Sequence, residues 1–190
     1  MQIDLGSGDG KGPLRLARRE PSRLFVAVDV NADSLSRTAW RAARREARGG
    51  VRNLLCIAAS ATELSRELPG VADRVTILLP WGELLLAVAA PEPATLEAIA
   101  ALCRTDASLE IVFSYDPRRD PSIPALRDYQ GISAARVETR LREPYRRAGL
   151  DIHRVEDLDN RALLDYPTTW ARRLAHGDSR KIWRIGGRRG

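Results

Sequence analysis

The sequence predicts a doubly wound α/β fold, in which a mostly parallel sheet of seven strands carries helices on both faces. A glycine-rich turn follows a short apolar run at the very start of the chain. An acid ends the second apolar run, about twenty residues further on. Short apolar runs then alternate with helical segments along the remaining sequence, which is typical of parallel sheets. We therefore expect ligands to bind at the carboxyl ends of the strands.

The first twelve residues, MQIDLGSGDGKG, join the end of a buried strand to a turn in which glycines let the backbone approach a ligand. Their DxGxGxG spacing differs from the dinucleotide fingerprint and from the triphosphate-binding loop. Asp4 and Asp9 put negative charge where a phosphate needs hydrogen-bond donors. A cationic ligand fits better, and the sulfonium and amino-acid head of S-adenosylmethionine favour a methyltransferase. An ordinary glycine turn is the alternative interpretation.

The second strand of the predicted sheet ends at Asp29, where doubly wound folds hold a ribose by its hydroxyl groups. A helix N-cap is the alternative for Asp29, although Asn31 and Asp33 can fill that role. The other elements expected in this half are a helix over 13–19, a strand over 24–28, a helix over 33–48, a strand over 53–58 and a turn over 59–62.

In the second half, a strand over 74–79 runs directly into the tripeptide Pro80-Trp81-Gly82. A long connection over 156–179 holds the polar and aromatic cluster Tyr166-Pro167-Thr168-Thr169-Trp170. The remaining expected elements are a helix over 94–104, a strand over 108–115, a proline-rich loop over 116–124, a helix over 133–148 ended by Gly149, and strands over 150–155 and 181–185.

Composition favours one globular domain over residues 1–190. No apolar stretch reaches 18 residues and no signal peptide is visible, so we expect a cytoplasmic protein without a membrane span. Cys56 and Cys103 stand alone in apolar segments, as reduced core thiols do. With only His153 and His176 besides, we expect no metal site.

The net charge is +6, and the basic residues gather in two places. Arg37, Arg41, Arg44, Arg45 and Arg48 recur at helical spacing, and the last twenty residues hold seven basic residues and one acidic residue. A solvated helix face is the alternative for each cluster taken singly. Together, the two clusters favour a polyanionic partner.

Four motifs, DLGSGDGKG, VAVD, LLPWGELL and TTWARRL, resemble one narrow family. It is the kanamycin–apramycin resistance type of aminoglycoside-resistance methyltransferase, which modifies N1 of adenine 1408 in the decoding site of 16S rRNA. The resemblance implies a class I S-adenosylmethionine-dependent (Rossmann-like) methyltransferase fold. It also implies S-adenosylmethionine as the cofactor and 16S rRNA in the assembled 30S subunit as the partner of a monomeric enzyme without metal. Members carry an N-terminal hairpin that we expect this chain to lack.

The resemblance also implies roles for individual residues. Those expected to bind the cofactor are Asp4, Gly6, Gly8, Asp29, Ala61, Thr62, Leu79, Trp81 and Thr168. Those expected to bind RNA are Arg41, Arg44, Arg45, Arg173 and Arg180, and those expected to act in catalysis are Trp81 and Trp170.

Adenine N1 already carries a lone pair, so methylation there requires positioning more than a general base. The base must leave its stack to be reached, and aromatic side chains hold extruded bases. We predict that Trp81 and Trp170 stack on opposite faces of that base, with the segment of Trp170 ordered only when RNA docks. Trp40 and Trp183 are predicted to be core residues. The alternatives are a non-catalytic RNA-binding domain and a methyltransferase for another RNA nucleotide or a small molecule.

Overall fold

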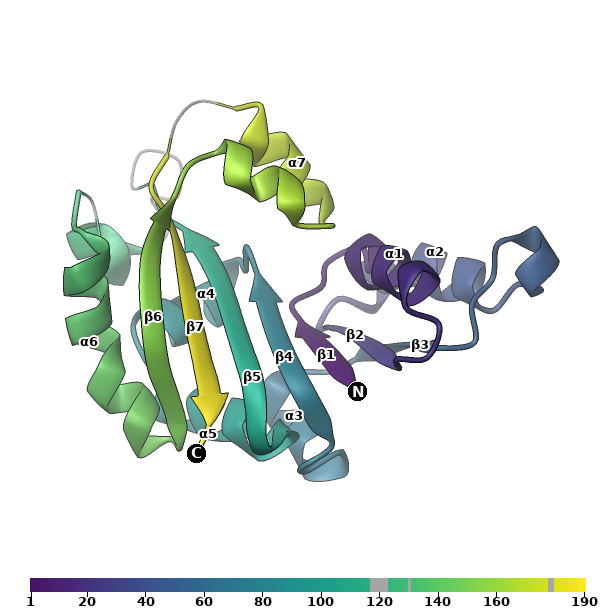
Figure 1. Ribbon diagram of the computed structural model, residues 1–190, viewed down its shortest axis with the longest axis horizontal. Coiled ribbons are helices and arrows are strands. Elements are labelled where there is room, and N and C mark those ends of the chain that lie inside the picture. The colour runs from purple at the N-terminus through teal and green to yellow at the C-terminus, as the bar shows by residue number, and fades with distance from the viewer. Residues whose placement is uncertain (117–122, 130, 178–179) are drawn as a thin grey trace.

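The computed structural model describes residues 1–116, 123–129, 131–177 and 180–190. Its strands form one seven-stranded sheet in the order β3-β2-β1-β4-β5-β7-β6, as Figure 1 shows. The strands are β1 (Gln2–Leu5), β2 (Phe25–Asp29), β3 (Leu54–Ala58), β4 (Ala72–Leu78), β5 (Cys103–Ser114), β6 (Leu150–Leu158) and β7 (Ile182–Arg189). Most of the predicted proline-rich loop (residues 117–122) and residues 178–179 of the predicted connection lie outside the described residues.

The sheet is mostly parallel, as predicted. Strands β1 to β5 pair in parallel, and β7 lies antiparallel between β5 and β6. The order of strands reverses direction between β1 and β4, so the chain leaves these neighbours toward opposite sides. This is the position at which doubly wound sheets leave a crevice for a ligand at the carboxyl ends of their strands.

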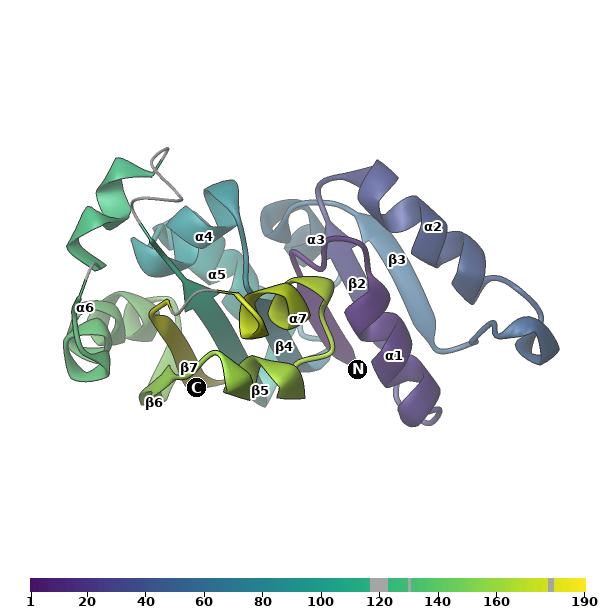
Figure 2. The ribbon, with the colours of Figure 1, turned by 90° about the horizontal axis from the view of Figure 1, so that it is seen from above.

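Helices cover both faces of the sheet. Helices α1 (Lys11–Arg19) and α2 (Ala32–Ala42) lie on one face over β1 to β3. The helices on the other face are α3 (Ala61–Glu67), α4 (Gly82–Ala89), α5 (Pro93–Leu102) and α6 (Ala134–Arg147). Seen from above in Figure 2, α7 (Thr169–Ala175) crosses the carboxyl edge of the sheet. Three short 3-10 helices complete the described elements: η1 (Glu46–Arg48), η2 (Pro124–Tyr129) and η3 (Arg161–Asp165).

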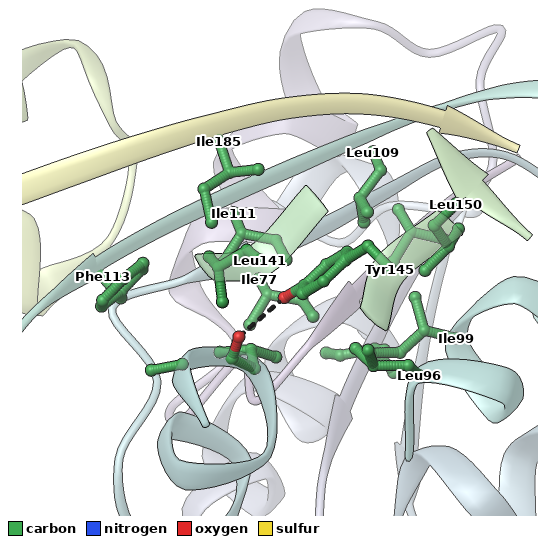
Figure 3. Packing of buried hydrophobic residues seen from close by; sticks show 14 of the residues in the cluster. Ile77, Leu96, Ile99, Leu109, Ile111, Phe113, Leu141, Tyr145, Leu150 and Ile185 are labelled. Atoms are coloured by element: carbon green, nitrogen blue, oxygen red, sulfur yellow. Dashed lines mark hydrogen bonds between the residues drawn. The ribbon is translucent and has the colours of Figure 1, made fainter. Parts of the chain in front are cut away.

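The largest core cluster fills the space between the sheet and α3 to α6. Alternate strand residues such as Ile77, Ile111 and Ile185 face this side and are fully buried. Figure 3 shows Tyr145 of α6 among them, and its hydroxyl group donates a hydrogen bond of 2.9 Å to the carbonyl oxygen of Val88. A smaller cluster lies between β2 and β3 and the two helices of the opposite face. Packing of helices against both faces of the sheet therefore fixes the positions of the strand ends.

Helix α2 is shorter than predicted, since it ends at Ala42 and not at Arg48. The chain becomes extended at Arg45 and then forms η1. Arginines spaced three and four residues apart repel one another on a helix, which disfavours its continuation. The carbonyl oxygen of Ala42 instead accepts a hydrogen bond from the amide of Val51. Arg44 and Arg45 thus lie beyond the helix on which they were predicted.

Trp183 is fully buried, as predicted, whereas the prediction for Trp40 was wrong because its side chain is 65% exposed. The core face of α2 carries Leu35, Thr38 and Ala42. At about 100° per residue, Trp40 lies roughly 140° away from Leu35 around the helix. Helical periodicity therefore places this indole ring on the solvent side.

The sequence did not predict helices α3, α4, η3 and α7, nor the full length of several strands. The predicted turn over 59–62 continues into α3, the segment after Trp81 forms α4, and the connection after β6 contains η3 and α7. Strand β5 begins at Cys103, inside the predicted helix over 94–104, and β6 and β7 run further than predicted. No single helix in the described part of the chain is long and apolar enough to cross a membrane. The pair α4 and α5 passes that test only jointly, with a bend of 93° between the two helices.

Candidate functional site

A cavity of about 790 Å³ opens at the carboxyl ends of β1, β2 and β4, beside α7. Every residue predicted to bind the cofactor contributes to its lining, and so do Trp170 and Arg173. The fold therefore brings together segments that are far apart in the sequence, which are the glycine loop, the end of β2, the start of α3, the Leu79–Gly82 turn and α7.

The glycine loop between β1 and α1 requires its glycines. Gly6, Gly8 and Gly10 have φ angles of 68°, 58° and 65°, in the left-handed region that other residues rarely adopt. A Cβ atom added at Gly6 would lie 2.7 Å from the side chain of Leu84, whereas one added at Gly8 would meet nothing within 4 Å. The backbone at Gly8 therefore presents an open side to the cavity that it lines.

Asp29 holds the loop in place and retains hydrogen-bonding capacity. Its two carboxylate oxygens accept hydrogen bonds from the amides of Gly8 at 2.8 Å and Asn31 at 2.9 Å. Each oxygen has a further lone pair, which can accept a ligand hydroxyl. The N-cap of α2 is Asn31, whose side chain accepts from the amide of Ser34. Helix capping therefore does not account for the carboxylate of Asp29. This agrees with our sequence-based choice of a ligand-binding role over an N-cap role for this residue.

Asp4 is a buried acid at the floor of the cavity, with 5% of its surface exposed. Burial raises the pKa of its carboxyl group to about 7, although the hydroxyl group of Thr76 opposes this shift by donating a hydrogen bond of 2.5 Å. The group therefore retains its proton to a higher pH than an exposed aspartate does. A cation placed in the cavity would favour the carboxylate and displace the proton.

Asp9 connects the glycine loop to α7, a contact that the sequence did not indicate. Its carboxylate accepts hydrogen bonds from Lys11 and, at 3.1 Å, from the hydroxyl group of Thr169. Partial burial raises the pKa of Asp9, but these hydrogen bonds outweigh it and hold the pKa below its usual value. Arg15 also donates to the carbonyl oxygen of Pro167 at 2.5 Å. Hydrogen bonds therefore tie the segment before Trp170 to the glycine loop and to α1.

Trp81 reaches the cavity through a sharp backbone turn. Leu79 has a φ of 55° and Gly82 a φ of 58°, and the amide of Leu79 donates to the carbonyl oxygen of Val112 at 2.7 Å. A left-handed conformation at a leucine costs about 1–3 kcal/mol and is concentrated at functional sites. The turn leaves the Trp81 side chain 49% exposed.

Trp81 and Trp170 lie against each other at the cavity. Their ring centroids are 5.4 Å apart with an angle of 39° between the ring planes, and Trp170 is 42% exposed. The guanidinium group of Arg173 lies 5.4 Å from the centre of the Trp170 ring. Stacked bases are spaced by about 3.4 Å, so two walls around one base stand about 7 Å apart. The rings are closer than a two-sided stack requires.

The start of α3 forms another wall of the cavity, through Ala61 and Thr62. Ser60 and Glu63 make a capping box, in which each side chain accepts a hydrogen bond from the other residue's backbone amide. The sequence pattern SxxE is typical of a capping box and indicates the start of a helix, although we predicted only a turn here. Val30, 76% exposed beside Asp29, also lines the cavity and was not predicted.

The arginines predicted to bind RNA lie in separate places. Arg173 lies at the cavity, while Arg41, Arg44 and Arg45 are exposed at the end of α2 and beyond it. Arg180 is half-buried before β7, and its buried Nε atom has no hydrogen-bond partner within the described part of the chain. The fold does not join these arginines into one cluster.

The described residues contain no group of three or more histidine, cysteine or acidic side chains placed to hold a metal ion. Cys56 and Cys103 are free thiols, and burial raises the pKa of Cys103 to about 11.

Comparisons with known proteins agree with this geometry. The family model for the 16S rRNA (adenine(1408)-N(1))-methyltransferase NpmA matches residues 1–188. The chain is 34% identical to the protein of that name from Streptoalloteichus tenebrarius, over 90% of this chain and 79% of the relative. It is 30% identical to the corresponding Escherichia coli protein, over 98% of this chain and 86% of the relative.

Solved structures give the same result. The crystal structure of the 16S rRNA methyltransferase KamB is similar with a TM-score of 0.88 and 32% identity, covering 100% of this chain and 87% of that one. A tryptophan-to-alanine mutant of the Catenulisporales acidiphilia 16S rRNA (adenine(1408)-N(1))-methyltransferase, solved with its cosubstrate SAM, is similar with a TM-score of 0.85 and 30% identity. It covers 99% of this chain and 84% of that one. The fold is the class I methyltransferase fold, and the chain belongs to the family of 16S rRNA (adenine(1408)-N(1))-methyltransferases.

Proposed function

We propose that this protein methylates N1 of adenine 1408 in 16S rRNA of the assembled 30S subunit, with S-adenosylmethionine as cosubstrate, and so confers resistance to aminoglycosides such as kanamycin and apramycin. Membership of the family supports the reaction. The observation that carries the proposal for this chain is the exposed pair Trp81 and Trp170 at the cavity that the glycine loop and Asp29 line.

The lining of the cavity fits S-adenosylmethionine. Asp29 has lone pairs for two ribose hydroxyls, and the open backbone at Gly8 allows a close approach. Asp4 supplies a carboxyl group whose ionisation a sulfonium or ammonium group would favour. Ala61, Thr62 and Leu79 add small or apolar surface for an adenine ring, and Thr168 borders the cavity from the α7 side.

S-adenosylmethionine supplies, when bound, an electrophilic methyl group. The protein's task is to hold adenine N1 in line with that group at about 3 Å, because the lone pair of N1 needs no base to create it. Among the described residues that line the cavity there is no histidine or cysteine, in keeping with catalysis by positioning. Trp81 and Trp170 provide the aromatic surfaces for the extruded base.

The two indole rings have to part before a base can enter between them. Trp170 lies on α7, which is only seven residues long, whereas Trp81 is fixed by the strained turn after β4. We propose that Trp170 moves, with Arg173 following the ring or turning toward an RNA phosphate. The predicted two-sided stack is then the RNA-bound arrangement, and the ring pair is the arrangement without RNA.

The finer features of the proposal concern the context of the reaction. We propose that residues 1–190 act as one methyltransferase domain and as a monomer, with Arg41, Arg44, Arg45, Arg173 and Arg180 contacting rRNA through their positive charge. Because the proposed partner is a ribosomal subunit, the reaction would take place in the cytoplasm.

Primer extension on 16S rRNA from cells expressing the protein tests the proposal. Methylation at N1 blocks Watson–Crick pairing, so reverse transcriptase should stop next to adenine 1408. Expression of Asp29→Ala, which we expect to be inactive, is the control. A stop at another nucleotide would show a different target. No stop, together with normal 30S binding, would favour the non-catalytic RNA-binding alternative.

A further inference from the structure

A second hollow lies at the end of α2 and shares no lining residue with the cofactor cavity. It has a volume of about 420 Å³ and is lined by Trp40, Ala43, Arg44, Arg45 and Arg48. In Figure 1 the end of α2 and the chain that follows form the extreme right of the molecule, away from α7. All five lining side chains are exposed to solvent.

The arginines around this hollow have no carboxylate partner among the residues that the structure describes. Within the described residues, no carboxylate lies within ion-pair distance of Arg44, Arg45 or Arg48, whereas Glu46 pairs with Arg52 at 3.0 Å. The guanidinium group of Arg44 instead lies 5.0 Å from the centre of the Trp40 ring. The hollow thus combines an exposed aromatic face with several cations, which matches a base and its flanking phosphates.

The backbone around the hollow is held in place before any partner arrives. The carbonyl oxygen of Arg45 accepts hydrogen bonds from the amides of Arg48 and Gly50, and Arg18 of α1 donates to the carbonyl oxygen of Gly49 at 2.7 Å. Gly50 packs so tightly that an added Cβ atom would lie 1.7 Å from the carbonyl oxygen of Arg44. A preorganised surface binds a ligand at a lower entropic cost.

We propose that this hollow binds a single unstacked nucleotide of 16S rRNA other than the methylated adenine. The base replaces the guanidinium group of Arg44 over the ring of Trp40, Arg44 moves to the edge of that stack, and Arg45 and Arg48 contact the adjoining phosphates. The inference rests on the proposed function, since it assumes that the protein docks on 16S rRNA. It adds a second base-binding site, which would fix the orientation of the enzyme on the 30S subunit.

The test compares Trp40→Ala, Trp40→Leu and Trp40→Phe in equilibrium binding to 30S subunits. Stacking is worth about 1–3 kcal/mol per base, so Trp40→Ala should weaken 30S binding by about 5- to 150-fold. Trp40→Phe should stay within about threefold of the wild type, because it keeps a π-face. Trp40→Leu should behave like Trp40→Ala. Affinity for S-adenosylmethionine should remain unchanged in all three variants.

Salt dependence separates the base from the phosphates. Trp40→Ala should weaken binding without changing the slope of log affinity against log salt, whereas Arg45→Gln and Arg48→Gln should each lower that slope by about 0.7–0.9. Leu55→Ala is the matched control, because Leu55 is also a large exposed apolar residue (49% exposed, against 65% for Trp40) but lies on the edge strand β3 outside the hollow. It should bind 30S subunits like the wild type.

Chemical probing of 16S rRNA in the complexes identifies the nucleotide. One base other than adenine 1408 should change its reactivity with the wild type and not with Trp40→Ala. Wild-type affinity in Trp40→Ala, equal binding by the leucine and phenylalanine variants, or the absence of such a base would overturn the inference. A loss of affinity without any such base would indicate a ribosomal protein as the partner of Trp40. Failure of the wild type to bind or methylate 30S subunits would instead refute the proposed function.

Discussion

The cofactor cavity and the hollow at the end of α2 differ in what builds them. The cavity lining includes left-handed backbone at Gly6, Gly8, Leu79 and Gly82, and acids that hydrogen bonds tie to neighbouring segments, such as Asp29 to Gly8 and Asp9 to Thr169. The hollow consists of exposed side chains, with cations that have no carboxylate partner in the described part of the chain. One substitution in the cavity should therefore change cofactor affinity strongly. Each arginine of the surface should contribute a smaller, salt-dependent part of the affinity for RNA.

The largest effect is expected at Asp29. Two charge-assisted hydrogen bonds to ribose hydroxyls are worth about 1.5–3 kcal/mol each, so Asp29→Ala should weaken S-adenosylmethionine binding more than a hundredfold. Calorimetry measures this directly, and a thermal melt shows whether the glycine loop survives without its acceptor. Asp33→Ala is the matched control, because Asp33 is an exposed acid of the same segment outside the cavity. An unchanged dissociation constant in Asp29→Ala would remove this residue from the site.

Loss of either indole at the cavity should lower turnover by at least about tenfold, since each would remove one stacking wall. Phenylalanine at Trp81 or Trp170 should retain part of the activity. Both side chains are more than 40% exposed, so the alanine variants should melt close to the wild-type temperature and should still bind cofactor. Kanamycin and apramycin tolerance of expressing cells provides the readout. Full resistance with Trp170→Ala would refute the two-sided stack, and a collapsed melting temperature for Trp81→Ala would indicate a packing role instead.

Asp4 should make both stability and cofactor binding depend on pH. Its pKa is about 7 in the folded protein, against an ordinary value near 4, so the folded state holds a proton that the unfolded chain has released. The free energy of unfolding should therefore fall as pH rises from about 4 to about 7, by up to about 1.4 kcal/mol per pH unit. Denaturant titrations between pH 5 and 8 measure this contribution as the difference between wild type and Asp4→Asn.

Cofactor binding at Asp4 should follow the opposite trend. A cationic ligand prefers the carboxylate, so S-adenosylmethionine affinity should rise with pH by up to about tenfold per unit below pH 7 and then level off. Calorimetry in buffers of different ionisation enthalpy should detect proton release on binding. An affinity that is flat between pH 5 and 8 in the wild type would show that Asp4 does not contact the charged part of the cofactor.

The smallest single effects are expected for the arginines at the end of α2. Arg41→Gln or Arg45→Gln should weaken 30S binding only a few-fold at a given salt concentration and lower the salt slope by about 0.7–0.9 each. Cofactor affinity should not change, because neither residue lines the cavity. An unchanged salt slope after a triple charge reversal at Arg41, Arg44 and Arg45 would refute their contact with rRNA phosphates. These residues would then be only a solvated surface.

Residues whose role depends on local backbone could be predicted from the sequence. A left-handed turn requires glycine, which is why the spacing of Gly6, Gly8 and Gly10 along the chain is enough to indicate a ligand loop. Asp29 could be placed because a parallel strand delivers its last residue to the ligand edge. The exposure of Trp40 could also have been predicted from helical periodicity, since Leu35, Thr38 and Ala42 define the buried face.

Helices α4 and α7 could not be predicted in this way. The sequence of α4, GELLLAVA, is apolar on nearly all sides and has no helical period, because the surrounding core buries it. Helix α7 is seven residues long; besides its local Thr168 cap, it is stabilised by distant partners, namely Asp9, which accepts a hydrogen bond from Thr169, and the apolar residues packed on Ala171. Short helices are not stable by propensity alone.

The sheet, the glycine loop, the acid at the end of β2 and, through four motifs, the family all follow from the amino-acid sequence, because each depends on residues that are neighbours along the chain. The folded arrangement was needed to establish that Trp81 and Trp170 touch, that Asp4 is buried beside Thr76, and that the arginines surround Trp40 beyond the end of α2. Contact, burial and the resulting pKa depend on groups that the fold brings together from distant positions, and no local pattern encodes their distances.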